Sequence, residues 1–98
     1  MSQFDVYRSG DGDALLLDCQ SGLLGQFDTR LIIPLIHIQA AQKLSRLHPI
    51  FEIDGQQYMM ATQLASAVEA KELGACIASL ADRRYDILNA VDMLLTGV

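Results

Sequence analysis

Two histidines are the first candidates for chemistry in this sequence, because an imidazole can ligate a metal or act as a base near neutral pH. His37 and His48 lie eleven residues apart, and neither has an acidic or cysteine neighbour at ligand spacing. His37 alternates with Ile36 and Ile38, which is typical of an outward-facing or half-buried strand residue. We therefore expect neither a metal site nor a histidine base.

Cysteine and aspartate offer two further possibilities. Cys19 and Cys76 are the only cysteines, they lack the CxxC or Cys/His spacing of zinc sites, and both stand among aliphatic residues. We interpret them as buried, reduced thiols, with a disulfide or a reactive thiol as the alternatives. Asp11 and Asp13 bracket Gly12, but the longer ligand pattern of an EF-hand is absent, so we interpret them as turn residues.

The sequence contains no recognised motif for group transfer. Residues 9–12 lack the Gly-Lys-Ser/Thr ending of a phosphate-binding loop. No serine stands in a nucleophile elbow; those considered are Ser21, Ser45, Ser66 and Ser79. Because no catalytic set is assembled, the sequence predicts a binding protein without a cofactor.

A C-terminal helix over residues 82–98 is the clearest element that could position a binding surface. Five aliphatic side chains recur on one helical stripe: Ile87, Leu88, Val91, Leu94 and Leu95. The residues expected on the polar side are Asp86, Asn89 and Asp92. Asp82 is predicted to cap the helix start or to place a carboxylate near its positive end, and Gly97 is predicted to end the helix.

Upstream of this helix, the sequence predicts short strands separated by turns. We expect strands over residues 3–8, 14–20 and 29–38, and a hairpin of residues 50–53 and 57–62 around Asp54-Gly55. In the first strand, one face should hold Phe4, Val6 and Arg8, and the other Asp5 and Tyr7. Of Met59 and Met60, one side chain should reach the core. Pro34 predicts a sheet edge, a bulge or a strand end, since it cannot donate to a ladder.

The remaining segments carry weaker signals. Residues 39–47 suit a turn or one or two helical turns, and residues 63–68 an extended or irregular link. Residues 69–81 are Ala-rich and favour a helical start, which Gly74 weakens. The order of elements predicts an α+β fold, namely a small twisted antiparallel sheet or half-open barrel covered by a C-terminal α-helix.

Residues 21–28 form a predicted loop with an adjacent leucine pair, Leu23 and Leu24, between two glycines. An exposed pair would need a partner surface, and the alternative is a loop that folds its leucines back into the core.

Length and composition limit the classes of function that this chain could have. A chain of 98 residues predicts a single domain, residues 1–98, and its 51% hydrophobic content indicates either an oligomer or an aliphatic-rich core. A net charge of −5 without a basic stripe disfavours direct nucleic-acid binding. We expect a cytoplasmic protein without membrane contact, because neither a signal peptide nor an apolar run of bilayer length is present.

Several short segments together resemble the CcdB toxins of toxin–antitoxin modules, in order and with close spacing over nearly the whole chain. They are Phe4-Asp5-Val6-Tyr7, Cys19-Gln20-Ser21, Arg30-Leu31-Ile32-Ile33-Pro34-Leu35, Tyr58-Met59-Met60, Ala65-Ser66, Asp86-Ile87-Leu88-Asn89-Ala90 and the Gly97-Val98 end. The resemblance implies an SH3-like sheet with a C-terminal helix, a homodimer, binding to the DNA gyrase A subunit and neutralisation by a CcdA-like antitoxin.

The same resemblance implies which residues bind the target and where this chain departs from the family. The implied target-binding residues are Leu23, Leu24, Asp92, Leu95, Thr96, Gly97 and Val98, supported by Phe4, Tyr7, Gln20 and Ser21. Asp92 stands where the family carries asparagine, and Thr96 where it carries the terminal tryptophan. Loss of a large aromatic anchor predicts weakened gyrase poisoning.

Two alternatives to a gyrase poison stay open. One is a non-toxic CcdB homologue that keeps antitoxin binding. The other is a ribonuclease toxin of the MazF type, which shares the SH3-like fold. The low content of clustered Lys and Arg disfavours the ribonuclease, because RNA cleavage needs a basic groove.

Overall fold

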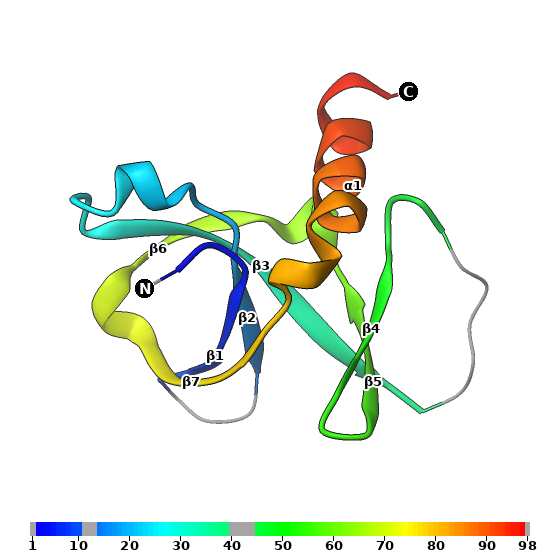
Figure 1. Ribbon diagram of the computed structural model, residues 1–98, viewed down its shortest axis with the longest axis horizontal. Helices are drawn as coiled ribbons and strands as arrows, with labels where there is room; N and C mark the ends of the chain where they lie inside the picture. The colour runs from blue at the N-terminus through cyan, green and yellow to red at the C-terminus, as the bar shows by residue number, and fades with distance from the viewer. Residues whose placement is uncertain (1, 11–13, 40–44, 98) are drawn as a thin grey trace.

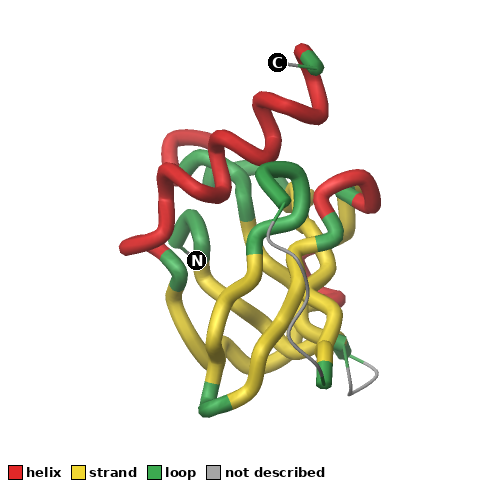
Figure 2. The backbone as a smooth tube through the Cα atoms, turned by 90° about the vertical axis from the view of Figure 1, so that its right-hand side faces the viewer, coloured by secondary structure: helices red, strands yellow, loops and turns green. Residues whose placement is uncertain are grey.

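The computed structural model describes residues 2–10, 14–39 and 45–97. Within these ranges seven strands form one antiparallel sheet: β1 (Asp5–Ser9), β2 (Leu15–Asp18), β3 (Thr29–Ile38), β4 (Ile50–Ile53), β5 (Gln56–Met60), β6 (Ser66–Glu69) and β7 (Leu73–Ser79). The strand order is β4-β5-β3-β2-β1-β7, and β6 pairs with β3. The sheet is strongly curled, and α1 (Arg84–Thr96) packs against it (Figures 1 and 2). The predicted α+β half-barrel with a C-terminal helix is confirmed.

The described residues also form four short 3-10 helices between these elements: η1 (Gly22–Leu24), η2 (Thr62–Leu64), η3 (Ala70–Glu72) and η4 (Ala81–Arg83). The hairpin predicted around Asp54-Gly55 is confirmed. Both residues have positive φ, 53° at Asp54 and 77° at Gly55, as the tightest hairpin turns require.

Strand β3 is the long strand on which the sheet is built. Its first part, Thr29–Ile32, pairs with β6, and its last part, Leu35–Ile38, pairs with β5. Pro34 lies where these two partners meet, and its carbonyl accepts a hydrogen bond from Ala61 at 3.0 Å. Proline has no N–H to donate, and an N–H at this position would face the same side, where neither β6 nor β5 pairs with Pro34. Of the predicted alternatives, an edge position is therefore confirmed on this side, whereas β3 does not end at Pro34 and continues through it.

The main core lies between the curled sheet and α1. Its buried members are Phe4, Val6, Leu15, Leu17, Ile33, Leu35, Phe51, Ile53, Met60, Leu80, Ile87 and Ala90. Met60 is the methionine that reaches this core, as predicted. Tyr7 was expected on the face opposite to Val6, and it is on that face, yet it is also buried. The sheet therefore buries side chains on both faces of β1, β2 and the start of β3.

Helix α1 buries fewer of its aliphatic residues than predicted. Ile87 is fully buried and Val91 packs against the core, but Leu88, Leu94 and Leu95 are 38%, 40% and 76% exposed. The C-terminal half of α1 projects beyond the sheet, so its outer leucines have no surface to cover within one chain (Figure 1). The predicted five-residue stripe is therefore wrong for these three leucines.

The ends of α1 differ in how well the sequence predicted them. Gly97 adopts a left-handed conformation with φ 75°, and its N–H donates to the Met93 carbonyl, which confirms the predicted helix end. Asp82 does not cap the start, since it lies in η4 and the N-cap residue is Arg83. Asp86 in the first helical turn accepts a hydrogen bond from Arg83 Nε at 2.8 Å.

The predicted helical start in residues 69–81 is wrong. The segment forms η3 and strand β7, which pairs with β1 through two register shifts. Pairing with β1 overrides the helical preference of alanine, because strand formation depends on neighbours more than on propensity. A Cβ at Gly74 would lie 2.9 Å from the Arg8 carbonyl oxygen, so the glycine permits this close approach. The link predicted as extended or irregular over residues 63–68 is extended where it forms most of β6, and the end of η2 at its start was not predicted.

Both histidines lie away from acidic and cysteine clusters. His37 is exposed on β3 and its ring lies 5.5 Å from that of Tyr58, while His48 shares a hydrogen bond with Gln63. No group of three potential metal-ligating side chains occurs within the described ranges. Asp11, Asp13 and residues 40–44 lie outside those ranges. No helix in the described part of the chain has the length and apolar character to cross a bilayer.

The two thiols occupy different environments. Cys19 and Cys76 are both free; Cys19 is half-buried, and Cys76 is exposed on β7. The prediction of two buried thiols is therefore wrong for Cys76, because β7 has a partner strand on only one side. Burial, followed by the neighbouring Asp18 carboxylate, raises the pKa of the Cys19 thiol from 9.0 to about 12.

We expect a thiol reagent at pH 8 to modify Cys76 of the native protein rapidly, and Cys19 only after unfolding. The raised pKa lowers the thiolate fraction of Cys19 about a thousandfold, and the thiolate is the reactive form. Mass spectrometry of the native chain and of Cys76→Ser after timed iodoacetamide treatment measures this. Rapid labelling of Cys19 in folded Cys76→Ser would contradict the prediction.

Candidate target-binding site

The leucine pair predicted as a target-binding surface lies in η1, between β2 and β3. Leu23 is 89% exposed and Leu24 is 44% exposed, so the alternative of a loop folded into the core is wrong. Phe27, later in the same connection, and Leu31, near the start of β3, are 54% and 41% exposed. We call these four apolar residues the η1 surface. Phe27 was not singled out from the sequence, although it is the only aromatic residue of the connection.

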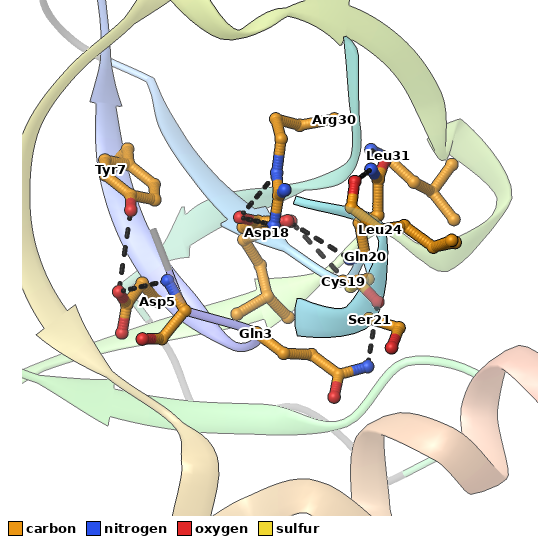
Figure 3. A network of polar contacts seen from close by, with 12 residues as sticks. Gln3, Asp5, Tyr7, Asp18, Cys19, Gln20, Ser21, Leu24, Arg30 and Leu31 are labelled. Carbon is orange, nitrogen blue, oxygen red and sulfur yellow. Dashed lines mark hydrogen bonds and ion pairs between the residues drawn. The ribbon is translucent and has the colours of Figure 1, made fainter. Parts of the chain in front are cut away.

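Hydrogen bonds hold η1 in place where apolar packing cannot. The Ser21 hydroxyl accepts from the Leu23 N–H at 3.2 Å, which caps the 3-10 helix. The Gln20 side chain donates to the Leu24 carbonyl and accepts from the Leu31 N–H, each at 3.0 Å (Figure 3). The supporting residues Gln20 and Ser21 therefore contact the leucine pair directly, through its backbone.

A buried ion pair lies beneath this segment, and the sequence analysis missed it. Arg30 Nε and Nη2 donate to Asp18 Oδ2 at 3.0 and 2.7 Å (Figure 3). Arg30 is 2% exposed and Asp18 is fully buried. Asp18 is opposite Ile32 in the sheet and Arg30 precedes Ile32 by two residues on β3, so Asp18 and Arg30 face the same side; this follows only from the register of β2 against β3.

Phe4 and Tyr7, the other supporting residues, are buried and cannot contact a target directly. Phe4 belongs to the main core, and its N–H donates to the Asp18 carbonyl. The Tyr7 hydroxyl lies 3.5 Å from Asp5 Oδ2, and burial, followed by the Asp5 carboxylate, raises the pKa of Tyr7. Their role in any site is therefore to shape the sheet below η1.

The end of α1 carries the other predicted target-binding residues. Leu95 is 76% exposed, and Asp92, Thr96 and Gly97 are exposed as well. The Thr96 hydroxyl donates to the Asp92 carbonyl at 2.7 Å within the helix. This bond already uses the hydroxyl proton of Thr96. Val98 lies outside the described residues.

The structure does not bring the two halves of the predicted site together within one chain. The η1 segment and the end of α1 stand apart on the same side of the sheet in Figure 1, η1 at the upper left and the helix end at the top. A target that contacts both must span the space between them, or meet residues from two chains.

Comparison with known proteins decides the family. The CcdB protein family matches residues 3–97, which is almost the entire chain. The chain belongs to the CcdB family. This membership places it among the toxins of toxin–antitoxin systems, as the resemblance of its short segments implied.

Solved structures with the same fold carry a different activity in their names. An endoribonuclease in complex with its cognate antitoxin, from a mycobacterial species, matches with a TM-score of 0.78 at 13% identity. The match covers 97% of this CcdB-family chain and 94% of the other. A second mycobacterial endoribonuclease matches with a TM-score of 0.77 at 12% identity, covering 97% and 90%. At such low identity these matches establish the fold alone.

Proposed function

We propose that this CcdB-family protein is a non-enzymatic toxin that binds the A subunit of DNA gyrase in the cytoplasm. The observation that carries the proposal is the leucine pair of η1, which is exposed and yet fixed by hydrogen bonds. A rigid exposed aliphatic pair is suited to insertion into an apolar site on another protein, because little conformational entropy is lost on binding.

A homodimer is part of the same proposal. Exposed apolar residues outside the predicted target-binding set offer surface for a second copy: Leu64 on η2, and Leu88 and Leu94 on α1. A stable interface would bury roughly 1,200–2,000 Å² in total. We expect sedimentation at micromolar concentration to give twice the chain mass of 10.8 kDa, and the 10.8 kDa species alone would refute the dimer.

We further propose that a CcdA-like antitoxin neutralises the protein. Family membership supports this, as does the fold neighbour that was solved with its cognate antitoxin. A disordered antitoxin segment that folds on binding could cover a large part of so small a toxin. Titration calorimetry with the antitoxin-like peptide encoded beside this gene is the test, and absence of binding at micromolar concentration would count against it.

The altered helix end leads us to propose that gyrase poisoning is weakened. An aromatic anchor contributes about 2–4 kcal/mol at an interface, and Thr96 cannot replace it. Its hydroxyl could add about 1 kcal/mol through one hydrogen bond, but the donor is already engaged with the Asp92 carbonyl. A non-toxic homologue that retains antitoxin binding is the alternative that this helix end favours.

We expect Thr96→Trp to increase gyrase A binding by about tenfold or more, and Thr96→Trp with Asp92→Asn to increase it further. The tests are pull-down of the gyrase A subunit and growth of a bacterial host for the native chain and both variants. Ile36→Trp, which places an indole on an exposed aliphatic residue of β3, is the matched control. Strong killing through gyrase by the native chain would show that the aromatic anchor is dispensable here.

A ribonuclease function receives less support from the residues of this chain. Arg30, the one arginine inside the curled sheet, is 2% exposed and paired with Asp18, so it cannot reach an RNA phosphate. The net charge of −5 also opposes RNA binding. Cleavage of a labelled RNA by the purified chain at a rate abolished by a single substitution would overturn the non-enzymatic proposal.

A further inference from the structure

We infer that the Gln20 side chain is a positioning element that fixes the exposed leucine pair of η1 relative to β3, with the buried Asp18–Arg30 ion pair as its anchor. The inference rests on the proposed function, since it concerns target binding through the same leucines. Gln20 itself need not touch the target. Its effect on binding would pass through the geometry of Leu23 and Leu24.

The first step is the bridge that the Gln20 amide forms. Oε1 accepts from the Leu31 N–H and Nε2 donates to the Leu24 carbonyl, both at 3.0 Å. One end of the amide is thus attached to the sheet and the other to the last residue of η1. Glutamine is suited to this task because its side chain combines an acceptor and a donor. Glutamate keeps only the acceptor, and leucine keeps neither.

The second step is the anchor that fixes Gln20. Its N–H donates to Asp18 Oδ1 at 3.1 Å, while Asp18 Oδ2 accepts both bonds from Arg30. The Arg30 guanidinium therefore sets the orientation of the carboxylate that holds Gln20. The neighbouring Cys19 N–H also donates to the Leu31 carbonyl, at 2.8 Å. The anchor and the bridge thus end on adjacent residues of β3, Arg30 and Leu31 (Figure 3).

The third step is the consequence for Leu23. With 89% of its surface exposed, its side chain cannot be ordered by the core. Its position depends on the backbone of η1, which the Ser21 cap and the Gln20 bridge hold from opposite ends. Loss of the bridge would leave both leucines present but able to adopt several positions. A target would then have to order them, which lowers affinity.

The test combines amide hydrogen exchange of the free protein with binding to the gyrase A subunit, both far below the unfolding temperature. In Gln20→Leu we expect the Leu31 amide, which donates to Gln20 Oε1, to exchange at least tenfold faster, while the Val6 amide is unchanged. We expect gyrase A binding to weaken about tenfold, as for one or two lost hydrogen bonds. Gln57→Leu, an exposed glutamine on β5, is the matched control and should change neither quantity.

Two further variants separate positioning from stability. Gln20→Glu should keep the Leu31 amide protected, since it retains the acceptor, but it loses the donor to the Leu24 carbonyl and should weaken binding. Ile33→Val removes one buried methyl group from β3 without touching η1, and should leave binding intact. Equal loss of binding in Ile33→Val, or unchanged exchange and binding in Gln20→Leu, would overturn the inference. If the native chain does not bind gyrase A, the proposed function fails, and the exchange measurement alone decides on the bridge.

Discussion

Asp18→Asn is expected to lower the free energy of unfolding by about 3–5 kcal/mol, the cost of removing one partner from a buried ion pair. The substitution leaves the Arg30 guanidinium, which is 2% exposed, without the carboxylate that neutralises it. Domains typically have a total stability of about 5–15 kcal/mol, so the loss is a large share. Urea unfolding of the native chain and the variant, followed by circular dichroism, measures it.

Two further variants test whether the unpaired buried charge causes the loss of stability. Asp28→Asn removes an exposed carboxylate two residues from Arg30 and should shift the urea midpoint little. The double variant Asp18→Leu with Arg30→Met should be more stable than Asp18→Asn, because no buried charge is left without a partner. If Asp18→Asn unfolds at the same urea concentration as Asp28→Asn, the ion pair does not stabilise this fold.

Local signals predicted the elements whose conformation depends on a few adjacent residues. The positive φ angles at Asp54 and Gly55 follow from residue types that tolerate them, and Gly97 ends α1 for the same reason. Strand β3 was recognised from its run of β-branched residues and leucines. The leucine pair in the connection before β3 was recognised because two adjacent leucines in a predicted loop are unusual.

Features that depend on distant partners were not predictable in this way. Residues 73–79 become a strand only because β1 lies beside them, and their Ala-rich composition gave the opposite signal. Asp18 and Arg30 are twelve residues apart, and their pairing needs the register of β2 against β3. Leu88, Leu94 and Leu95 fit an amphipathic stripe, but the sheet is too small to cover them. Helical periodicity cannot reveal where the opposing surface ends.

Only part of the candidate site could be predicted, because some of its contacts also join residues that are distant in the sequence. The leucine pair and the helix end could be named from residues next to one another, and Gln20 only through the family resemblance. Its bridging role could not be derived from the sequence, because both of its partners are backbone groups, on Leu24 and Leu31. Any residue type can supply a backbone carbonyl or N–H, so the sequence carries no trace of such contacts.

Leu23→Asp is expected to weaken gyrase A binding at least a hundredfold and to abolish any growth inhibition. Truncation of a central apolar anchor typically costs 2 kcal/mol or more, and a carboxylate at that position adds the cost of desolvating a charge. With 89% of Leu23 exposed, the fold should lose less than about 0.5 kcal/mol. Binding to the immobilised gyrase A subunit and growth of an expressing host are the measurements.

Ile36→Asp is the matched control, because Ile36 is an exposed aliphatic residue near the end of β3 that is farther along the chain from η1. It introduces the same charge at another exposed aliphatic position, far along the chain from η1. We expect Ile36→Asp to bind gyrase A like the native chain. A Leu23→Asp variant that stays folded and binds gyrase A with native affinity would show that the target meets a different surface. The helix end, with Leu95 and Thr96, would then be the next surface to substitute.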